Sequence, residues 1–266
     1  MKTFLHQLRG KRTVLSVCLI ALLSASAFAA DDLSAALAHT RKHVATFLDQ
    51  FSDVKCTENV QQLRLTKHGK VEYKETSTFD YLLIAQNTAD DLDLQESRLA
   101  VNTAEHKKSA SLLVTNGFAI LELIFHPSYQ NSFTFTNGGT ELMDAKLLMR
   151  INFEAVKEGK SPTALLLRGR EFPLQLMGTA WVEPDTGVIH RIVATLAEPM
   201  TDLGLRTLNT DVHYSPVKFN GDPQVYWFPT DAEIEVETPR QHWRNIHHFT
   251  KYQQFNVSTQ ESVKTQ

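Results

Sequence analysis

The spacing of apolar residues predicts a helix early in the chain. From residue 32 to residue 51, apolar side chains recur at intervals of three and four, as on one face of an amphipathic helix. Asp31 and Asp32 stand at the beginning of this run, where the positive end of the helix dipole favours acidic side chains. The apolar face of the predicted helix consists of Leu33, Ala36, Leu37, Val44, Phe47, Leu48 and Phe51.

Beyond Cys56 the pattern changes, and apolar residues alternate with polar ones as in strands with one buried face. His68-Gly69 separates the first two alternating runs and has the composition of a tight turn. We therefore expect two antiparallel strands, followed by a loop at Asp90–Asp93. The apolar residues that share one parity in these strands are Leu63, Leu65, Val71, Tyr73, Phe79, Tyr81 and Leu83.

A second, shorter helix is predicted over residues 118–125. Asn116-Gly117 precedes this run, which is apolar nearly all round, and His126-Pro127 follows it. Proline disfavours the helical conformation at the residue before it, so the helix should end there.

Residues 142–156 fit either a helix or a strand. Alternation fits better, because one parity is apolar and the other carries Arg150, Asn152 and Glu154. We predict a strand that pairs with residues 133–136 across a turn at Asn137-Gly138-Gly139. The apolar parity contains Leu147, Met149, Ile151, Phe153 and Ala155.

From Ala164 to Val257 the chain is a succession of predicted strands broken by turns. The turns contain Arg168-Gly169-Arg170, Pro184-Asp185-Thr186-Gly187, Asn220-Gly221-Asp222-Pro223 and Pro239. In residues 231–238 acidic side chains alternate with apolar ones, so one face of that strand should meet water. The other face of such a sheet needs a cover. We predict a mostly β (α+β) fold, with a large curved antiparallel sheet, an unclosed β-barrel, folded around the two helices.

Charge becomes informative once an N-terminal leader is separated from the rest. The chain has 27 Lys and Arg against 30 Asp and Glu. Residues 1–29 contain four of the basic residues and no acid, which leaves 23 against 30 and a net charge of −7. A net acidic chain lacks the basic surface that nucleic-acid binding requires, so no nucleic-acid partner is expected.

Residues 1–29 have the pattern of a cleaved signal peptide. A basic segment precedes a 16-residue apolar stretch, and Ala27-Phe28-Ala29 has small residues where cleavage requires them. A membrane anchor would need about 20 apolar residues, and lipidation at Cys18 is disfavoured because Val17 precedes it. We predict a single domain over 30–258, a tail over 259–266, no integral membrane span in the mature chain, and export to the periplasm or beyond the cell.

Motifs for catalysis, metal binding or cofactor binding are absent from the sequence. The histidines of the C-terminal third have no His-Glu-x-x-His or Cys-x-x-Cys partner, and His247 and His248 should point to opposite faces of a strand. Same-face acids Glu233, Glu235 and Glu237 are better explained as a solvated strand face than as a glycosidase pair. Cys56 is expected to be a buried, inert thiol. We predict no catalytic residue, metal or cofactor.

One segment resembles a known family. Residues 178–192 read Gly-Thr-Ala-Trp-Val-Glu-Pro-Asp-Thr-Gly-Val-Ile-His-Arg-Ile, and this strand, Pro-Asp-Thr-Gly turn and return strand resemble the hairpin of LolA/LolB-like lipoprotein-localisation proteins. The C-terminal stretch from Trp243 to Phe255 resembles that of uncharacterised secreted bacterial proteins of this build. The resemblance implies an unclosed barrel whose apolar concave side is capped by helices and can hold acyl chains.

The alternation of residues along the predicted strands indicates which side chains could face such a concave side and line a hydrophobic site. They are Leu63, Leu65, Phe133, Phe135, Met149, Ile151, Trp181, Val212, Tyr214, Ile234 and Val236. The predicted function is non-enzymatic binding of a lipid, an acyl chain or a lipoprotein. An envelope interaction module with a solid core and a hydrolase of unknown specificity are the alternatives, and a continuous apolar cavity would favour the carrier.

Overall fold

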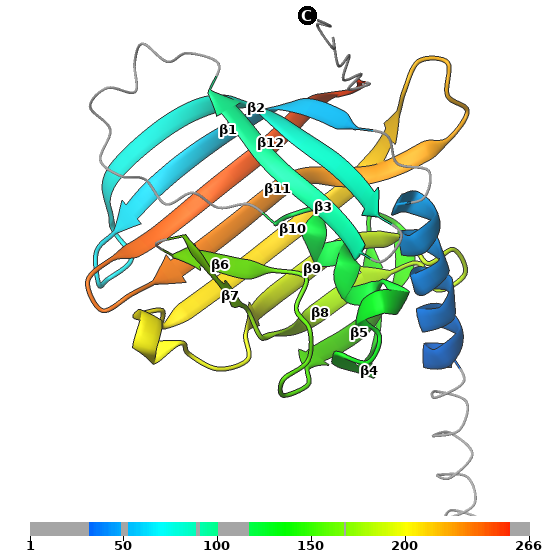
Figure 1. Ribbon diagram of the computed structural model, residues 1–266, viewed down its shortest axis with the longest axis horizontal. Coiled ribbons are helices and arrows are strands. Elements are labelled where there is room, and N and C mark those ends of the chain that lie inside the picture. The colour runs from blue at the N-terminus through cyan, green and yellow to red at the C-terminus, as the bar shows by residue number, and fades with distance from the viewer. Residues whose placement is uncertain (1–31, 49–52, 89–90, 101–116, 168, 256–266) are drawn as a thin grey trace, which may run out of the picture.

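The structure, a computed structural model, describes residues 32–48, 53–88, 91–100, 117–167 and 169–255 (Figure 1). Ten strands form one antiparallel sheet in the order β3-β2-β1-β12-β11-β10-β9-β8-β5-β4. They are β1 (Val54–Leu65), β2 (Val71–Thr88), β3 (Asp91–Ala100), β4 (Phe133–Met143), β5 (Lys146–Ala155), β8 (Leu176–Val182), β9 (Ile189–Leu196), β10 (Thr207–Lys218), β11 (Val225–Glu237) and β12 (His242–Gln254). Strands β3 and β4 each have one neighbour, so the predicted curved, unclosed sheet is confirmed.

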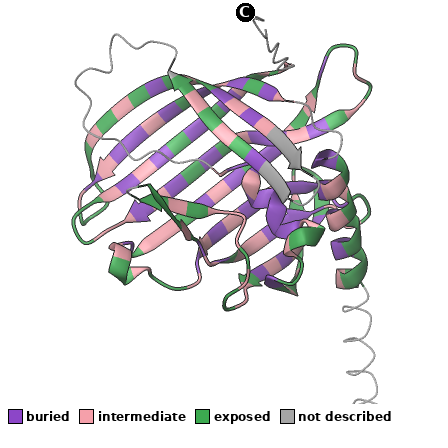
Figure 2. Cartoon of the chain, in the orientation of Figure 1, coloured by how far each residue is buried: buried purple, intermediate pink, exposed green. Residues whose placement is uncertain are grey.

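Two chain segments cover the concave face of this sheet, and we call them together the cover. One is the N-terminal helix (residues 32–48), and the other is the segment 117–130, which contains the 3-10 helices η2 (Ile120–Phe125) and η3 (Pro127–Tyr129). Their buried side chains join those of the sheet in one continuous apolar cluster. The alternation of buried and less buried residues along the strands is visible in Figure 2.

The N-terminal helix follows the predicted pattern. Five of its predicted apolar residues are buried in the cluster and Leu33 packs against it. Thr40 is also buried, and its hydroxyl donates to the carbonyl of Ala36 (2.8 Å). Phe51 and the predicted end of the helix lie outside the described residues.

The predicted loop at Asp90–Asp93 was wrong over residues 91–93, because they begin strand β3, which pairs with β2. Its inward-facing side chains include Glu96 and Arg98 as well as Leu94, so apolar alternation does not mark this strand. Both polar residues are satisfied by partners from other strands or from the cover. Residues 91–100 form a strand because they pair with the long strand β2 and because these contacts satisfy the inward polar side chains. Their composition alone does not indicate a strand.

Strand β5 confirms the choice of a strand over a helix for residues 146–155, and Met149, Ile151 and Phe153 are buried as expected. The predicted turn at Asn137-Gly138-Gly139 was wrong. The chain reverses at Asp144-Ala145, whose φ angles are 48° and 62°, and the glycine segment forms a β-bulge within β4. Glycine composition alone does not distinguish a bulge from a turn.

The turns predicted for the C-terminal half all connect strands. Of the predicted turn Arg168-Gly169-Arg170, Gly169 precedes β7 (Arg170–Pro173), which pairs with β6 (Ala164–Leu167) in a separate two-stranded sheet, and Arg168 lies outside the described residues. In β11 the apolar residues Ala232, Ile234 and Val236 are buried, as the alternation predicted. None of the helices that the structure describes is long and apolar enough to span a membrane. The predicted signal peptide and C-terminal tail lie outside the described residues.

Candidate functional site: the concave face and its cover

The N-terminal helix is docked against the turn between β8 and β9. Nδ1 of His39 lies 2.7 Å from the carbonyl oxygen of Pro184. Gly187 has a φ of 76°, and a Cβ atom there would lie 2.3 Å from the backbone carbonyl of His39. The Pro-Asp-Thr-Gly sequence therefore shapes the hairpin and also leaves the space that the helix backbone occupies.

Segment 117–130 is attached to the sheet by a carboxylate from β3. Glu96 accepts hydrogen bonds from four consecutive backbone N–H groups, those of residues 117 to 120, at distances of 2.5 to 3.1 Å. These are the N–H groups at the start of η2, which have no partner within a helix. From the opposite side, Tyr214 of β10 donates its hydroxyl to the carbonyl of Phe118 (2.7 Å).

A buried ionic cluster joins β1, β3 and β12 beneath this segment. Arg98 donates two hydrogen bonds to Glu58, one of them 2.6 Å long, and His247 Nδ1 lies 2.7 Å from Glu58 Oε1. Burial opposes ionisation of Glu58, but the hydrogen bonds from His247 and Arg98 outweigh it and lower the pKa. Burial lowers the pKa of His247. The ring of Phe118 packs 4.6 Å from that of His247, so the cluster also supports the cover.

Glu122 of η2 differs from these paired residues. It lies between Leu121 and Leu123 and is 4% exposed. Its carboxyl has no hydrogen-bond or ion-pair partner among the residues that the structure describes. Burial raises the pKa of Glu122 to about 8, so the carboxyl is mainly protonated at neutral pH.

Most of the predicted lining residues come together on the concave face. Phe135 is partly buried and packs against the apolar cluster. The members that belong to the cluster itself are Phe133, Met149, Ile151, Val212, Tyr214, Ile234 and Val236. Their placement follows the alternation read from the sequence, because each strand has one face toward the cover.

Trp181, Leu63 and Leu65 are buried but lie outside this cluster. The strand register places Trp181 opposite Arg150 and Arg191, and the guanidinium of Arg191 lies 4.7 Å from its ring centre. Trp181 is thus on the outer face of the sheet, contrary to the prediction.

Leu63 pairs with Lys74 and Arg244, so it also belongs to the opposite face, and Leu65 follows it at the same parity. The inward positions of β1 include the polar residues Glu58 and Gln62, which misled a prediction based on apolar residues alone.

The polar residues of the concave side were not predicted from the sequence. Two signals were present: Glu96 and Arg98 follow Leu94 at strand spacing, and Glu122 is the one acid in an apolar run. Neither signal identifies a partner, because Glu58, Arg98 and His247 are far apart in the sequence.

The remaining histidines and acids lie mainly on the outer face. His247 and His248 do point to opposite faces: His247 is buried, whereas His248 is exposed and its Nδ1 lies 2.7 Å from Asp231. Glu235 pairs with Arg244 and with His242, as part of the acidic face of β11. No group of three or more potential metal ligands occurs within the described ranges.

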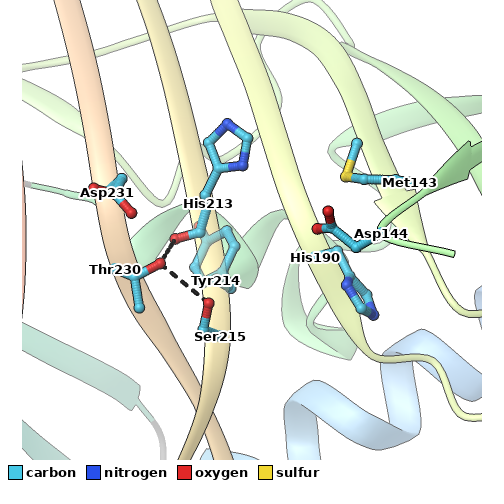
Figure 3. Close-up of a pocket in the computed structure, with 8 residues that line it drawn as sticks. All are labelled: Met143, Asp144, His190, His213, Tyr214, Ser215, Thr230 and Asp231. Carbon is cyan, nitrogen blue, oxygen red and sulfur yellow. Dashed lines mark hydrogen bonds between the residues drawn. The ribbon is translucent and has the colours of Figure 1, made fainter. Parts of the chain in front are cut away.

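A polar pocket of about 330 Å³ opens beside the end of the β9–β10 pairing (Figure 3). The two strands pair only as far as His213 and Arg191, and β10 has a bulge at the next residue, so they separate there. The hydroxyl of Ser215 lies 3.2 Å from that of Thr230. The lining residues are Met143, Asp144, His190, His213, Tyr214, Ser215, Thr230 and Asp231.

Cys56 lies in the apolar cluster and is 3% exposed. Burial raises the pKa of its thiol to about 12. The thiolate that reacts as a nucleophile is therefore scarcely populated at neutral pH.

Comparison with known proteins finds structural similarity without sequence similarity. No protein-family model matches the chain, and no curated protein matches it. A DUF1329 family protein from Desulfovibrio piger is 13% identical with a TM-score of 0.45, over 86% of this chain and 95% of that one. A LolA superfamily protein from Nitrosomonas europaea is 9% identical with a TM-score of 0.40, over 82% of this chain and 95% of that one. Both similarities extend over most of the chain at low sequence identity.

Proposed function

We propose that the chain is an exported, non-enzymatic binding protein that holds a hydrophobic ligand between its curved sheet and its cover. The observation that carries this proposal is the way the apolar concave face is closed. The two segments of the cover lie on it and contact it through side chains, and Leu165 of the hairpin β6–β7 packs against the same cluster. The two segments could move away without breaking any hydrogen bond of the strand ladder.

The energetics favour a long apolar ligand. Each CH₂ group transferred from water to an apolar site contributes about 0.8 kcal/mol, so an acyl chain could replace the apolar contacts of a displaced cover. The ligand class is a lipid, an acyl chain or the acyl group of a lipoprotein. The cluster residues Ile151, Val212, Ile234 and Val236 would then line the site.

A solid-core interaction module is the second candidate function. In the structure, side chains of the cover fill the concave face in one continuous cluster, and this observation favours a packed core. The polar pocket beside β9 and β10 offers less support for an enzyme. Its serine lies beside a threonine, whereas nucleophilic catalysis needs a base within hydrogen-bonding distance.

The compartment and boundaries belong to the same proposal. We infer cleavage of residues 1–29, a mature single domain over 30–258 and residence in the periplasm. Nucleic acid is not a proposed partner.

The test is native mass spectrometry of the mature chain, from Ala30, purified from its own cell envelope, followed by organic extraction of any bound material. A stoichiometric acyl-bearing ligand is the expected result. Ile234→Ala, on the concave face, should reduce its occupancy, whereas Ile246→Ala is the matched control because Ile246 is 38% exposed. A ligand-free mass, together with no uptake of a fluorescent fatty acid or alcohol, would contradict the binding protein and favour the interaction module with a solid core.

A further inference from the structure

Glu122 is a buried carboxyl that the fold does not use. A buried polar group without a partner destabilises a protein, and an apolar side chain of similar size would avoid that cost. The N–H groups at the start of η2 do not offset the cost of burying the Glu122 carboxyl, because those of residues 117–120 already donate hydrogen bonds to Glu96. An unpaired buried group of this kind is often part of a binding site.

The surroundings of Glu122 identify the charge that a ligand should bring. The acidic groups of the concave side are Glu58, Glu96 and Glu122. Arg98 is the cation that lies among them, and it is engaged by Glu58 in two hydrogen bonds. His247 is kept neutral by burial. The described interior therefore has more carboxyl groups than cations.

Arg41 of the N-terminal helix lies over the ring of Phe135, with its guanidinium 5.9 Å from the ring centre. It does not contribute to the pKa shift of Glu122, whose cause is burial. Tyr214 of β10 interacts electrostatically with Glu122 but gives its hydroxyl to Phe118. Tyr81 is buried and Tyr252 is partly buried; burial raises the pKa of both phenols, so both are neutral at pH 7. His43 of the N-terminal helix has a pKa lowered by burial and is neutral as well.

We propose that Glu122 binds the protonated amine of an amphiphilic ligand whose hydrocarbon chain lies on the concave face. The inference rests on the proposed function and specifies its ligand class. An ammonium donates hydrogen bonds to the carboxylate and balances the excess acid of the interior, and the pair forms in a site of low polarity. A fatty acid anion or a phosphate would instead add negative charge to this interior, so the site should reject both.

Amine binding should be accompanied by release of the proton that Glu122 carries in the free protein. Burial raises the pKa of Glu122 to about 8, so the free protein carries a proton there at pH 7. Binding an ammonium requires the carboxylate, so that proton is released to the solvent. Calorimetry in buffers with different ionisation enthalpies should detect release of close to one proton per ligand at pH 7.

The experiment compares three probes with the same chain length: dodecylamine, dodecanol and dodecanoate. The wild-type mature chain should bind the amine most tightly and the acid most weakly. Glu122→Gln should weaken amine binding about tenfold or more and abolish proton release, and it should leave dodecanol binding nearly unchanged. Glu154→Gln is the matched control, because Glu154 is exposed on β5.

Each outcome separates the ligand class from the proposed function. Unchanged amine affinity or unchanged proton release in Glu122→Gln, with dodecanol still bound, overturns the role of Glu122 and keeps the hydrophobic site. Dodecanol binding also shows that the variant is folded. Failure of all three probes to bind the wild-type chain contradicts both the hydrophobic site and the amine.

Discussion

At the scale of single residues, this protein buries several ionisable groups and treats them in different ways. Glu58 and Arg98 stay charged because they pair with each other. Cys56 and Glu122 are kept neutral by burial, which raises both pKa values. The burial of the Cys56 thiol was predicted correctly from its residue type, but the sequence had no means of predicting the environment of Glu122, which depends on the cover.

Cys56 should resist alkylation in the folded protein. Because burial raises its pKa to about 12, iodoacetamide at pH 8 should label the native mature chain far more slowly than the same chain in denaturant. Mass spectrometry of quenched samples measures both rates. Equal rates would mean that the cluster around Cys56 opens readily.

At the scale of elements, the sequence predicted most strands and both parts of the cover, because one-sided burial leaves a periodic pattern. It failed at β3, where inward-facing Glu96 and Arg98 interrupt that pattern. It also failed at the glycine segment of β4, since glycines serve both turns and bulges. Two attachments of the cover, at Gly187 and at Glu96, lend themselves to direct tests.

Gly187→Ala should destabilise the protein by about 2 kcal/mol more than Gly221→Ala. Both glycines have positive φ angles, 76° and 85°, but a Cβ at Gly221 meets nothing within 4 Å, whereas one at Gly187 collides with the helix backbone. The difference between the variants in urea unfolding therefore isolates the contact with the helix. Equal destabilisation would show that the helix shifts without cost.

Glu96→Gln should loosen segment 117–130. An amide has one acceptor oxygen and no charge, so it cannot replace the four hydrogen bonds of the carboxylate, and the expected loss is about 2 kcal/mol. Hydrogen exchange at the amides of residues 117–120 should accelerate. Glu171→Gln, at an exposed position of β7, is the control that should leave these rates unchanged.

At the scale of the whole molecule, the curved sheet brings groups from both ends of the chain into one interior. Glu58 and His247 are separated by 189 positions and are hydrogen-bonded. The number of acidic and basic groups in the buried interior therefore cannot be read from the composition of the chain. For the same reason, the dependence of stability on pH is set by the buried groups.

Stability should decline below about pH 4.5 and again between about pH 6.5 and 8. Below pH 4.5 Glu58 and Glu183 become protonated; against the effect of burial, their pKa values are lowered by His247 and Arg98 for Glu58 and by Lys146 and His190 for Glu183. Between pH 4.5 and 6.5 two effects oppose each other. Unfolded Glu122 loses a proton that folded Glu122 keeps, which lowers stability as the pH rises, and the unfolded chain binds a proton at His247 that the folded chain binds less readily, which lowers stability as the pH falls. Above pH 6.5 the Glu122 effect is no longer opposed, and it costs about 2 kcal/mol more between pH 6.5 and 8. Urea unfolding across this range tests the profile, and Glu122→Gln should remove the alkaline decline.

Short stretches of sequence were enough to predict the strand-rich architecture, the helical segments and the outward acidic face of β11, because these depend on local periodicity and turn chemistry. The side that Trp181 and Leu63 face, the strand at residues 91–93 and the contacts among Glu58, Arg98 and His247 became known only from the folded chain. Strand register and the pairing of buried charges are set between distant segments. A local pattern of residues contains no record of either.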